Sequence, residues 1–230
     1  MQTNSSDGEE IMTNAKEIFI NYRKSLSSIC NYGFINLRWW GKIYNYSKKK
    51  PDVINISPFF FLSAQNAYFD CALWNLILLF DPYSKKNKPL TIEKFLNFIE
   101  QNQKMFRNVS LNQLKKEIES DKKLLLGKLN MLDKLEKLRN KRLAHLDLKY
   151  AGNYNEIFKK FSIPINEMEK LFILAGEIIN RYSAYFDKIT YPFNMKKYIN
   201  MAVNDLMVYL ERGKKGFEND AIKINNQNLK

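Results

Sequence analysis

Apolar residues recur near the start of this chain at the spacing of an α-helix. They follow one another at steps of four and three residues, as Ile11, Ala15, Ile18, Tyr22, Leu26 and Ile29. This spacing forms one face of an amphipathic helix, and that face must be buried against another element. Ser6 and Glu9 have the spacing of a capping box that begins such a helix. The first segment therefore predicts a long helix that packs into a larger assembly.

The same helical signals continue along the rest of the chain, separated by polar or proline-containing breaks. We expect further helices over residues 37–46, 58–80, 91–99, 110–120, 125–138, 166–186 and 194–212. Their starts are marked by the capping signals Ser57-Pro58, Thr91, Ser110 and Asn166. The 58–80 segment is apolar on most sides, which predicts a position in the middle of a bundle.

These helical signals predict the fold class. No alternating strand pattern, internal repeat or glycine-rich phosphate loop is present, and the eight glycines and six prolines are few for this length. We predict an all-α fold, a bundle of long antiparallel helices. One helical domain is expected over residues 1–213, with Gly213 ending the last helix. Residues 214–230 are expected to form a polar, mobile tail.

Cysteine and histidine are too scarce and too scattered for a metal site of the usual kind. Cys30 and Cys71 are isolated, and the chain has one histidine, whereas zinc needs three or four ligands. We therefore expect no metal and no cofactor. The polar, acidic N-terminus does not resemble a signal peptide. The longest apolar run, 71–80, is too short to span a membrane. A cytoplasmic protein without a membrane partner is expected.

The formal net charge of +13 has two interpretations. It attracts polyanions such as RNA, or it reflects a composition rich in lysine, asparagine, isoleucine and tyrosine. The lysine runs 48–50 and 85–88 fit solvated loops or contacts to an RNA backbone. Trp39, Trp40 and Tyr44 could stack on unpaired bases, but their helical spacing favours core positions.

The single histidine lies in the segment Arg139-Asn140-Lys141-Arg142-Leu143-Ala144-His145-Leu146-Asp147, at the end of a leucine stripe. Histidine moves protons near neutral pH. Arginine binds phosphate oxygens and stabilises charge that develops on them. Together these residue types fit the cleavage of RNA, in which a 2′-hydroxyl attacks the adjacent phosphate.

This segment resembles the R-x4-6-H motif of the HEPN superfamily. It is most similar to the AbiU2-like branch, whose motif reads roughly R-[DN]-K-x-x-A-H-x-D. The resemblance extends upstream to Leu78-Leu79-Phe80-Asp81, Leu90-Thr91-Ile92 and Phe95-Leu96. It implies a HEPN fold, metal-independent endoribonuclease activity and a homodimer with the active site at its interface. It also implies a role as a toxin or abortive-infection effector in phage defence, which an antitoxin or another regulator would have to silence.

The resemblance also implies which residues form the site. Arg139 and His145 would be the motif arginine and histidine, and Asn140 the polar residue that orients the phosphate or the imidazole. We expect Lys141, Arg142 and Asp147 to contribute to RNA binding. Because one histidine cannot easily act as both acid and base, a second copy from a twofold partner would complete the two-histidine mechanism.

Helix geometry leaves the identity of the catalytic arginine open. In an ideal helix Arg139 and His145 lie about 120° apart around the axis, whereas Arg142 shares a face with His145. Either the helix ends or bends before His145, or the two residues converge across the dimer, or Arg142 is the catalytic arginine. The alternatives to an enzyme are a non-catalytic helical module that binds RNA or a partner, and a structural subunit in which His145 is a surface residue.

Overall fold

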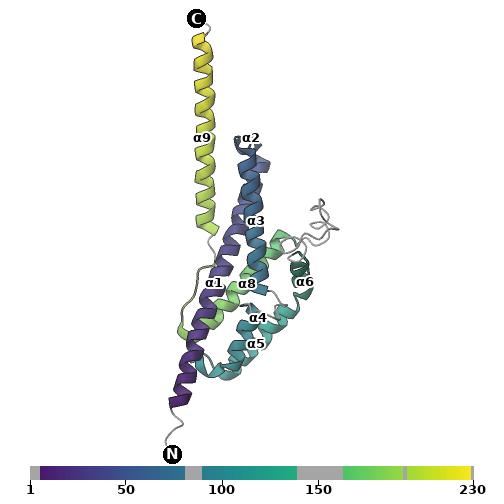
Figure 1. Ribbon diagram of the computed structural model, residues 1–230, viewed down its shortest axis with the longest axis vertical. Helices are drawn as coiled ribbons and strands as arrows, with labels where there is room; N and C mark the ends of the chain where they lie inside the picture. Colours follow the sequence, from purple (N-terminus) through teal and green to yellow (C-terminus); the bar gives the residue numbers. More distant parts are fainter. Residues whose placement is uncertain (1–5, 81–89, 139–162, 194–195, 229–230) are drawn as a thin grey trace, which may run out of the picture. The chain divides into compact units, whose positions relative to one another are not determined.

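The computed structural model describes residues 6–80, 90–138, 163–193 and 196–228. All regular elements in these ranges are helical, which confirms the all-α prediction. The helices are α1 (Ser6–Lys49), α2 (Pro51–Ile54), α3 (Pro58–Phe80), α4 (Ile92–Gln101), η1 (Gln103–Met105), α5 (Leu111–Leu126), α6 (Leu129–Leu138), α8 (Ile165–Asp187) and α9 (Lys196–Asn228) (Figure 1).

The chain forms two compact units. Unit 1 contains Met1–Phe34 and Leu73–Phe193, and unit 2 contains Ile35–Ala72 and Asn194–Lys230. The helices α1 and α3 each contribute one part to unit 1 and another part to unit 2. The expectation of one domain over residues 1–213 stays a prediction.

The two helices predicted at the start of the chain are one helix of 44 residues. The break expected between Ile29 and Leu37 is absent, and Gly33 in that stretch lies at a close helix contact. A Cβ atom at Gly33 would lie 2.3 Å from Cε1 of Phe172 on α8 and 2.7 Å from Cβ of Asn75 on α3. Glycine therefore lets the three helices approach closely inside unit 1.

Replacing Gly33 with alanine is expected to lower the free energy of unfolding by about 1–3 kcal/mol, because the added methyl group overpacks this contact. Gly41 provides a matched control on the same helix, since no atom beyond its chain neighbours and the adjacent backbone of α1 lies within 4 Å of its Cβ position. Gly41→Ala should raise the stability by about 0.5–1 kcal/mol through helix propensity alone. Urea unfolding of both variants measures the difference, and equal effects at the two positions would contradict this account.

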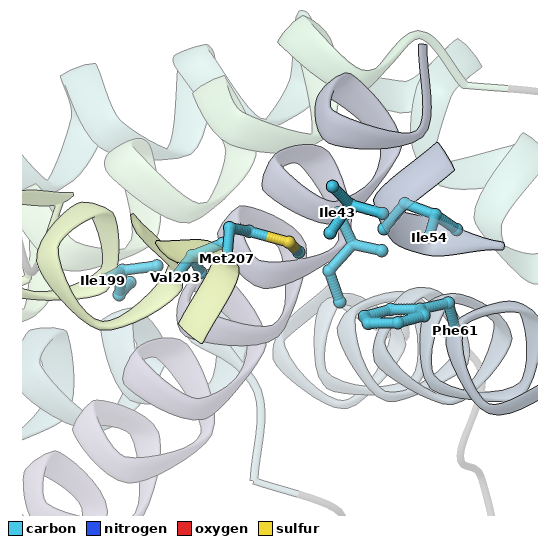
Figure 2. Packing of buried hydrophobic residues seen from close by; sticks show 7 residues of the cluster. Ile43, Ile54, Phe61, Ile199, Val203 and Met207 are labelled. Carbon is cyan, nitrogen blue, oxygen red and sulfur yellow. The ribbon is translucent and has the colours of Figure 1, made fainter. Parts of the chain in front are cut away.

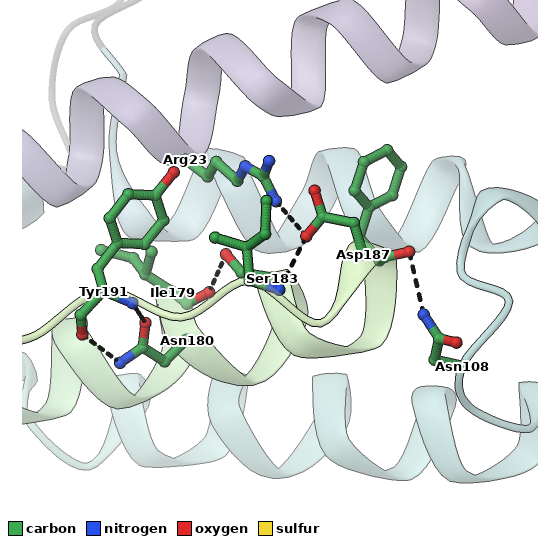
Figure 3. Close-up of polar contacts among 9 residues, drawn as sticks. Arg23, Asn108, Ile179, Asn180, Ser183, Asp187 and Tyr191 are labelled. Carbon is green, nitrogen blue, oxygen red and sulfur yellow. Dashed lines mark hydrogen bonds and ion pairs between the residues drawn. The ribbon is translucent and has the colours of Figure 1, made fainter.

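Aromatic side chains fill the core of unit 1 around Phe19, which is completely buried. Its ring centroid lies 5.4 Å from that of Phe95, 5.2 Å from Phe106 and 4.7 Å from Phe186. The neighbouring Arg23 is also buried. Its Nη1 atom lies 2.6 Å from Oδ1 of Asp187, so the guanidinium charge is paired at the edge of this cluster (Figure 3).

A short strap follows α8 and runs back along it. Lys188 adopts a left-handed conformation with φ of 65° and ends the helix. The Asn180 side chain then holds the strap at two points, because it accepts from the Tyr191 amide (2.7 Å) and donates to the Tyr191 carbonyl (2.9 Å) (Figure 3). The predicted cap Asn166 is wrong: Pro164 occupies the N-cap position, because α8 already begins at Ile165.

Unit 2 has its own apolar core, formed by side chains from α1, α2, α3 and α9. Figure 2 shows the cluster, which consists of Ile43, Val53, Ile54, Phe61, Ile199, Val203 and Met207. The prediction that α3 is buried on most sides is wrong for its first turns. Phe61 is 3% exposed, whereas Phe59 is 84% and Phe60 is 62% exposed. The helices of unit 2 cover only one side of α3 there.

The predicted helix end at Gly213 is also wrong, because α9 continues to Asn228. Glycine inside a helix costs only about 1 kcal/mol relative to alanine. Beyond Gly213, Nζ of Lys214 lies 2.9 Å from Oδ2 of Asp52 on α2, which ties the continued helix to unit 2. Glycine alone therefore does not end this helix.

Candidate functional site

The candidate catalytic segment begins where α6 ends. The last helical residue of α6 is Leu138. The predicted site residues follow it and lie outside the described residues: Arg139, Asn140, Lys141, Arg142, His145 and Asp147. Their roles therefore stay predictions. The structure describes α6, which precedes them, and the helices around it.

The leucine stripe of α6 is a packing face, as predicted. Leu132, Leu135 and Leu138 are buried, and they recur every three residues. Leu129, in the first turn, is half exposed. Because Leu138 is 2% exposed, the chain is anchored in unit 1 immediately before Arg139. Burial of this face holds the end of α6 against the unit 1 core.

A cavity of about 280 Å³ lies beside the first turn of α6. Its polar wall comes from Glu93 and Asn97 of α4 and from Lys122 of α5. Nζ of Lys122 also lies 2.6 Å from Oε2 of Glu100, so its charge is already paired. The remaining wall is apolar and consists of Phe80, Leu125, Leu126, Leu129 and Leu132. Such a wall suits an apolar group better than a phosphate.

A buried polar network connects α5 to α8. The Asp121 carboxylate is completely buried. Its Oδ1 atom lies 2.5 Å from Nη1 of Arg181, and its Oδ2 atom accepts a hydrogen bond of 2.8 Å from the Tyr182 hydroxyl. Glu117 lies at the rim, with 3.3 Å between its Oε2 and Nη1 of Arg181. These contacts fix α5, which leads through Gly127 into α6 and so to the motif segment.

The network shifts two pKa values. Burial raises the pKa of Tyr182 above its ordinary value, and the neighbouring Asp121 carboxylate raises it further, so the hydroxyl remains a donor. Burial is the largest single influence on Arg181 and would lower its pKa, but the hydrogen bond to Asp121 and the negative charges of Asp121 and Glu117 together hold the pKa above its ordinary value. The tyrosine stays neutral and the arginine charged, as the contacts to Asp121 require.

Sequence interpretation missed this network, although the sequence contains a signal for it. Asp121 stands in the apolar stripe of α5, where the buried positions are Leu114, Ile118, Asp121 and Leu125. When an acidic side chain occupies a core-facing position of a packed helix, its buried charge must be paired with another group. The helix predicted over 110–120 ends just before Asp121, whereas α5 continues to Leu126 and Gly127 follows as its C-cap.

The tryptophans of α1 occupy different environments within unit 2. Trp39 packs against the unit 2 core, and its ring lies 5.8 Å from that of Tyr68. The Trp40 and Tyr44 rings stack at 5.1 Å and 10°. Tyr44 is 39% exposed. Trp39 is thus partly buried against the core, in the direction that the helical spacing favoured, while the Trp40–Tyr44 pair reaches the surface.

Among the residues that the structure describes, no group of three or more histidine, cysteine, aspartate or glutamate side chains could hold a metal ion. None of the described helices is long and apolar enough to cross a lipid bilayer.

Comparison with protein families identifies a family for this chain. The model of the AbiU2 family of HEPN domains matches residues 12–205. The matched range includes α1 from its second turn, the other described helices of unit 1, and the candidate segment after α6. Comparisons with curated proteins and with solved structures found no match.

Proposed function

Because the chain belongs to the AbiU2 family of HEPN domains, we propose that it is a metal-independent endoribonuclease that acts in abortive infection. The observation that carries this proposal is the Arg139–Asp147 segment, which lies inside the matched range and follows directly on the buried end of α6. A toxin or phage-defence effector that cleaves RNA would act in the cytoplasm of a prokaryotic cell.

The proposed reaction is attack of a 2′-hydroxyl on the adjacent phosphorus. The bond from the 2′ oxygen to phosphorus forms and the bond from phosphorus to the 5′ oxygen breaks, which leaves a 2′,3′-cyclic phosphate and a 5′-hydroxyl. His145 would take the proton of the attacking hydroxyl or give one to the leaving oxygen. Arg139 would stabilise the charge that develops on the phosphate oxygens. Asn140 would orient the phosphate or the imidazole.

A homodimer is part of this proposal. Since the chain has one histidine, an acid and a base of this type require two chains. Arg142 and Lys141 would hold the RNA backbone, and Asp147 would complete the binding site. The net charge of +13 supports RNA as the substrate. An antitoxin or another regulator remains part of the proposal as a further partner.

The proposal predicts cleavage of single-stranded RNA in the presence of a chelator. The full chain is incubated with labelled RNA in excess EDTA, beside the same RNA with a single 2′-deoxynucleotide at the cleaved position. We expect cleavage of the first RNA, with a 2′,3′-cyclic phosphate end. We expect none at the substituted position, because the attacking hydroxyl is missing there.

Three other results would contradict the proposal. Cleavage that needs added Mg²⁺ would replace it with a metal-dependent mechanism. Salt-dependent binding to varied RNAs without any cleavage would favour the non-catalytic binding module. A monomeric mass in light scattering, combined with full activity, would exclude the two-histidine mechanism.

A further inference from the structure

The cavity beside α6 has two polar side chains on its α4 wall that are available to a ligand. The cavity is lined by α4, α5 and the start of α6, all within unit 1 (Figure 1). Glu93, Asn97 and Glu100 follow one another at steps of four and three residues, so they share one face of α4. Lys122 of α5 engages Glu100 at 2.6 Å. Within the described part of the chain, no hydrogen bond or ion pair engages the Glu93 carboxylate or the Asn97 amide.

The rest of the cavity wall is apolar, and part of it is open to solvent. Leu125 and Leu132 are buried, whereas Leu126 is 62% exposed and Leu129 is 51% exposed. Exposed apolar side chains that gather on a packed scaffold mark an interaction surface. The volume of about 280 Å³ lies just below the range of about 300–1,000 Å³ that is typical of sites for drug-sized molecules. The cavity therefore suits a smaller group that has apolar faces and a polar edge.

A nucleobase has this combination, and the free carboxylate selects among the bases. Proteins that read single-stranded RNA cover the faces of a splayed-out base and bind its Watson–Crick edge. A carboxylate only accepts hydrogen bonds, so it prefers an edge with two adjacent donors. Among the four RNA bases, guanine presents such an edge, as N1–H and N2–H. Adenine and cytosine place an acceptor beside the donor, and uracil flanks one donor with two acceptors. The Asn97 amide can donate to the guanine O6.

Other occupants fit this wall less well. A lysine or arginine from a protein partner would also pair with Glu93, but the net charge of +13 repels a cationic partner. A phosphate would be repelled by Glu93, and the Lys122 charge is already paired. An aliphatic chain would displace water from the carboxylate and the amide without replacing their hydrogen bonds, which lowers affinity.

Helix α6 connects the cavity to the motif segment. Leu132 lines the cavity, and Leu138 is the last residue of α6. From the rise of 1.5 Å per residue, the two lie about 9 Å apart along the helix axis. A stacked strand advances about 3.4 Å per nucleotide, so about three nucleotides span this distance. One base of a single strand can therefore enter the cavity while the backbone reaches the end of α6, where the motif segment begins.

We propose that this cavity binds a guanine base of single-stranded RNA. The Glu93 carboxylate accepts from N1–H and N2–H, and the Asn97 amide donates to O6. The inference rests on the proposed function, because it makes the proposed nuclease selective for RNA that carries guanine near the cleaved bond. It adds base recognition by α4 to a motif segment that is proposed to act on the phosphate and on protons.

The test compares RNAs that differ in one base, using a chain that cannot complete the proposed cleavage. The parent is the full-length His145→Ala protein, and the probe is labelled oligouridylate with one central guanosine, inosine or adenosine. Fluorescence anisotropy measures binding. The guanosine RNA should bind about 5- to 150-fold more tightly than the adenosine RNA, which is the usual discrimination by a bidentate base contact. Inosine lacks the N2 amino group, so its RNA should bind with intermediate affinity.

Glu93→Gln is the decisive variant, because it replaces the carboxylate with an amide of similar shape at an exposed position. Added to the parent, it should reduce the preference for guanosine over adenosine to less than about twofold. Glu119→Gln is the matched control, since it removes the same charge from an exposed position of α5 outside the cavity wall. It should keep the full preference for guanosine. Circular dichroism checks that both variants keep the helical content of the parent.

The outcomes separate this inference from the proposed function. If the parent binds the guanosine and adenosine RNAs equally or not at all, or if Glu93→Gln keeps the preference, the cavity is not a guanine site. If Glu93→Gln instead weakens binding of an amphipathic peptide of leucine and lysine and leaves RNA binding unchanged, the cavity takes a protein segment and the inference is overturned. If the Glu93-dependent preference is found and the chain with His145 cleaves no RNA, the inference stands and the nuclease proposal fails. If that chain cleaves RNA without any dependence on nearby guanosine or on Glu93, only the inference fails.

Discussion

Replacing His145 with alanine is expected to lower the rate of RNA cleavage by about 100- to 10,000-fold, because this is the usual contribution of a positioned acid or base. The chain has no second histidine that could take over. In a homodimer the substitution removes both copies at once, so the effect should lie toward the upper end of that range. Single-turnover cleavage of labelled RNA in EDTA measures it.

RNA binding by the same variant provides the control. His145→Ala should bind RNA with nearly the affinity of the parent, since the imidazole is proposed to move protons and not to anchor phosphates. Equal losses of binding and cleavage would indicate a structural role for His145. Cleavage that persists at the parent rate would contradict the mechanism.

Variants of Arg139 and Arg142 test which of the two is the catalytic arginine, a question that helix geometry leaves open. If Arg139 is the catalytic arginine, Arg139→Ala should lower the cleavage rate by an amount comparable to His145→Ala. Arg142→Ala should then mainly weaken binding. The reverse result would assign the catalytic role to Arg142, which shares a helix face with His145 in an unbroken helix.

Replacing Asp121 with alanine is expected to lower the free energy of unfolding by about 3 kcal/mol. Removing one partner of a buried ion pair leaves the other partner uncompensated, which typically costs about 3–5 kcal/mol. The Arg181 side chain keeps some solvent access, at 29% exposed, and retains Glu117 as a neighbour. The lower end of that range therefore applies. The Tyr182 hydroxyl also loses its acceptor. Urea unfolding measures the change.

Glu117→Gln is the matched control for this network. It removes a carboxylate from the same arginine, but the Glu117 side chain is 32% exposed and lies 3.3 Å from Nη1 of Arg181. The loss should therefore stay below about 1 kcal/mol. If Asp121→Ala costs no more than Glu117→Gln, the buried carboxylate does not stabilise the connection between α5 and α8.

Local signals in the sequence located most of the helix starts. Thr91 and Ser110 are N-caps as predicted, and their side-chain oxygens accept from the amides of Lys94 (3.3 Å) and Gln113 (3.2 Å). The Ser57-Pro58 pair predicted the start of α3 at Pro58. These predictions succeed because a cap or a proline acts on the backbone within one turn of its own position.

Two helices continue where the sequence predicted a break or an end. Gly33 lies in the stretch predicted to separate two helices, but it is inside α1, where the missing side chain leaves room for α8 and α3. Gly213 was predicted to end the last helix but lies inside α9, and Lys214 beyond it is paired with Asp52. A glycine inside a helix costs only about 1 kcal/mol, which contacts made by the rest of the helix can offset, and the sequence does not reveal which segments meet.

The sequence by itself determined the helical class, the capped helix starts and the place of the motif segment after the leucine stripe. These properties depend on periodicity, capping chemistry and residue order, which act over a few neighbouring residues. Only the tertiary structure decided that Phe61 is buried while Phe59 and Phe60 are exposed, and that Asp121 is a paired core residue. Burial and pairing depend on which distant helices come together, and helical periodicity carries no information on those partners.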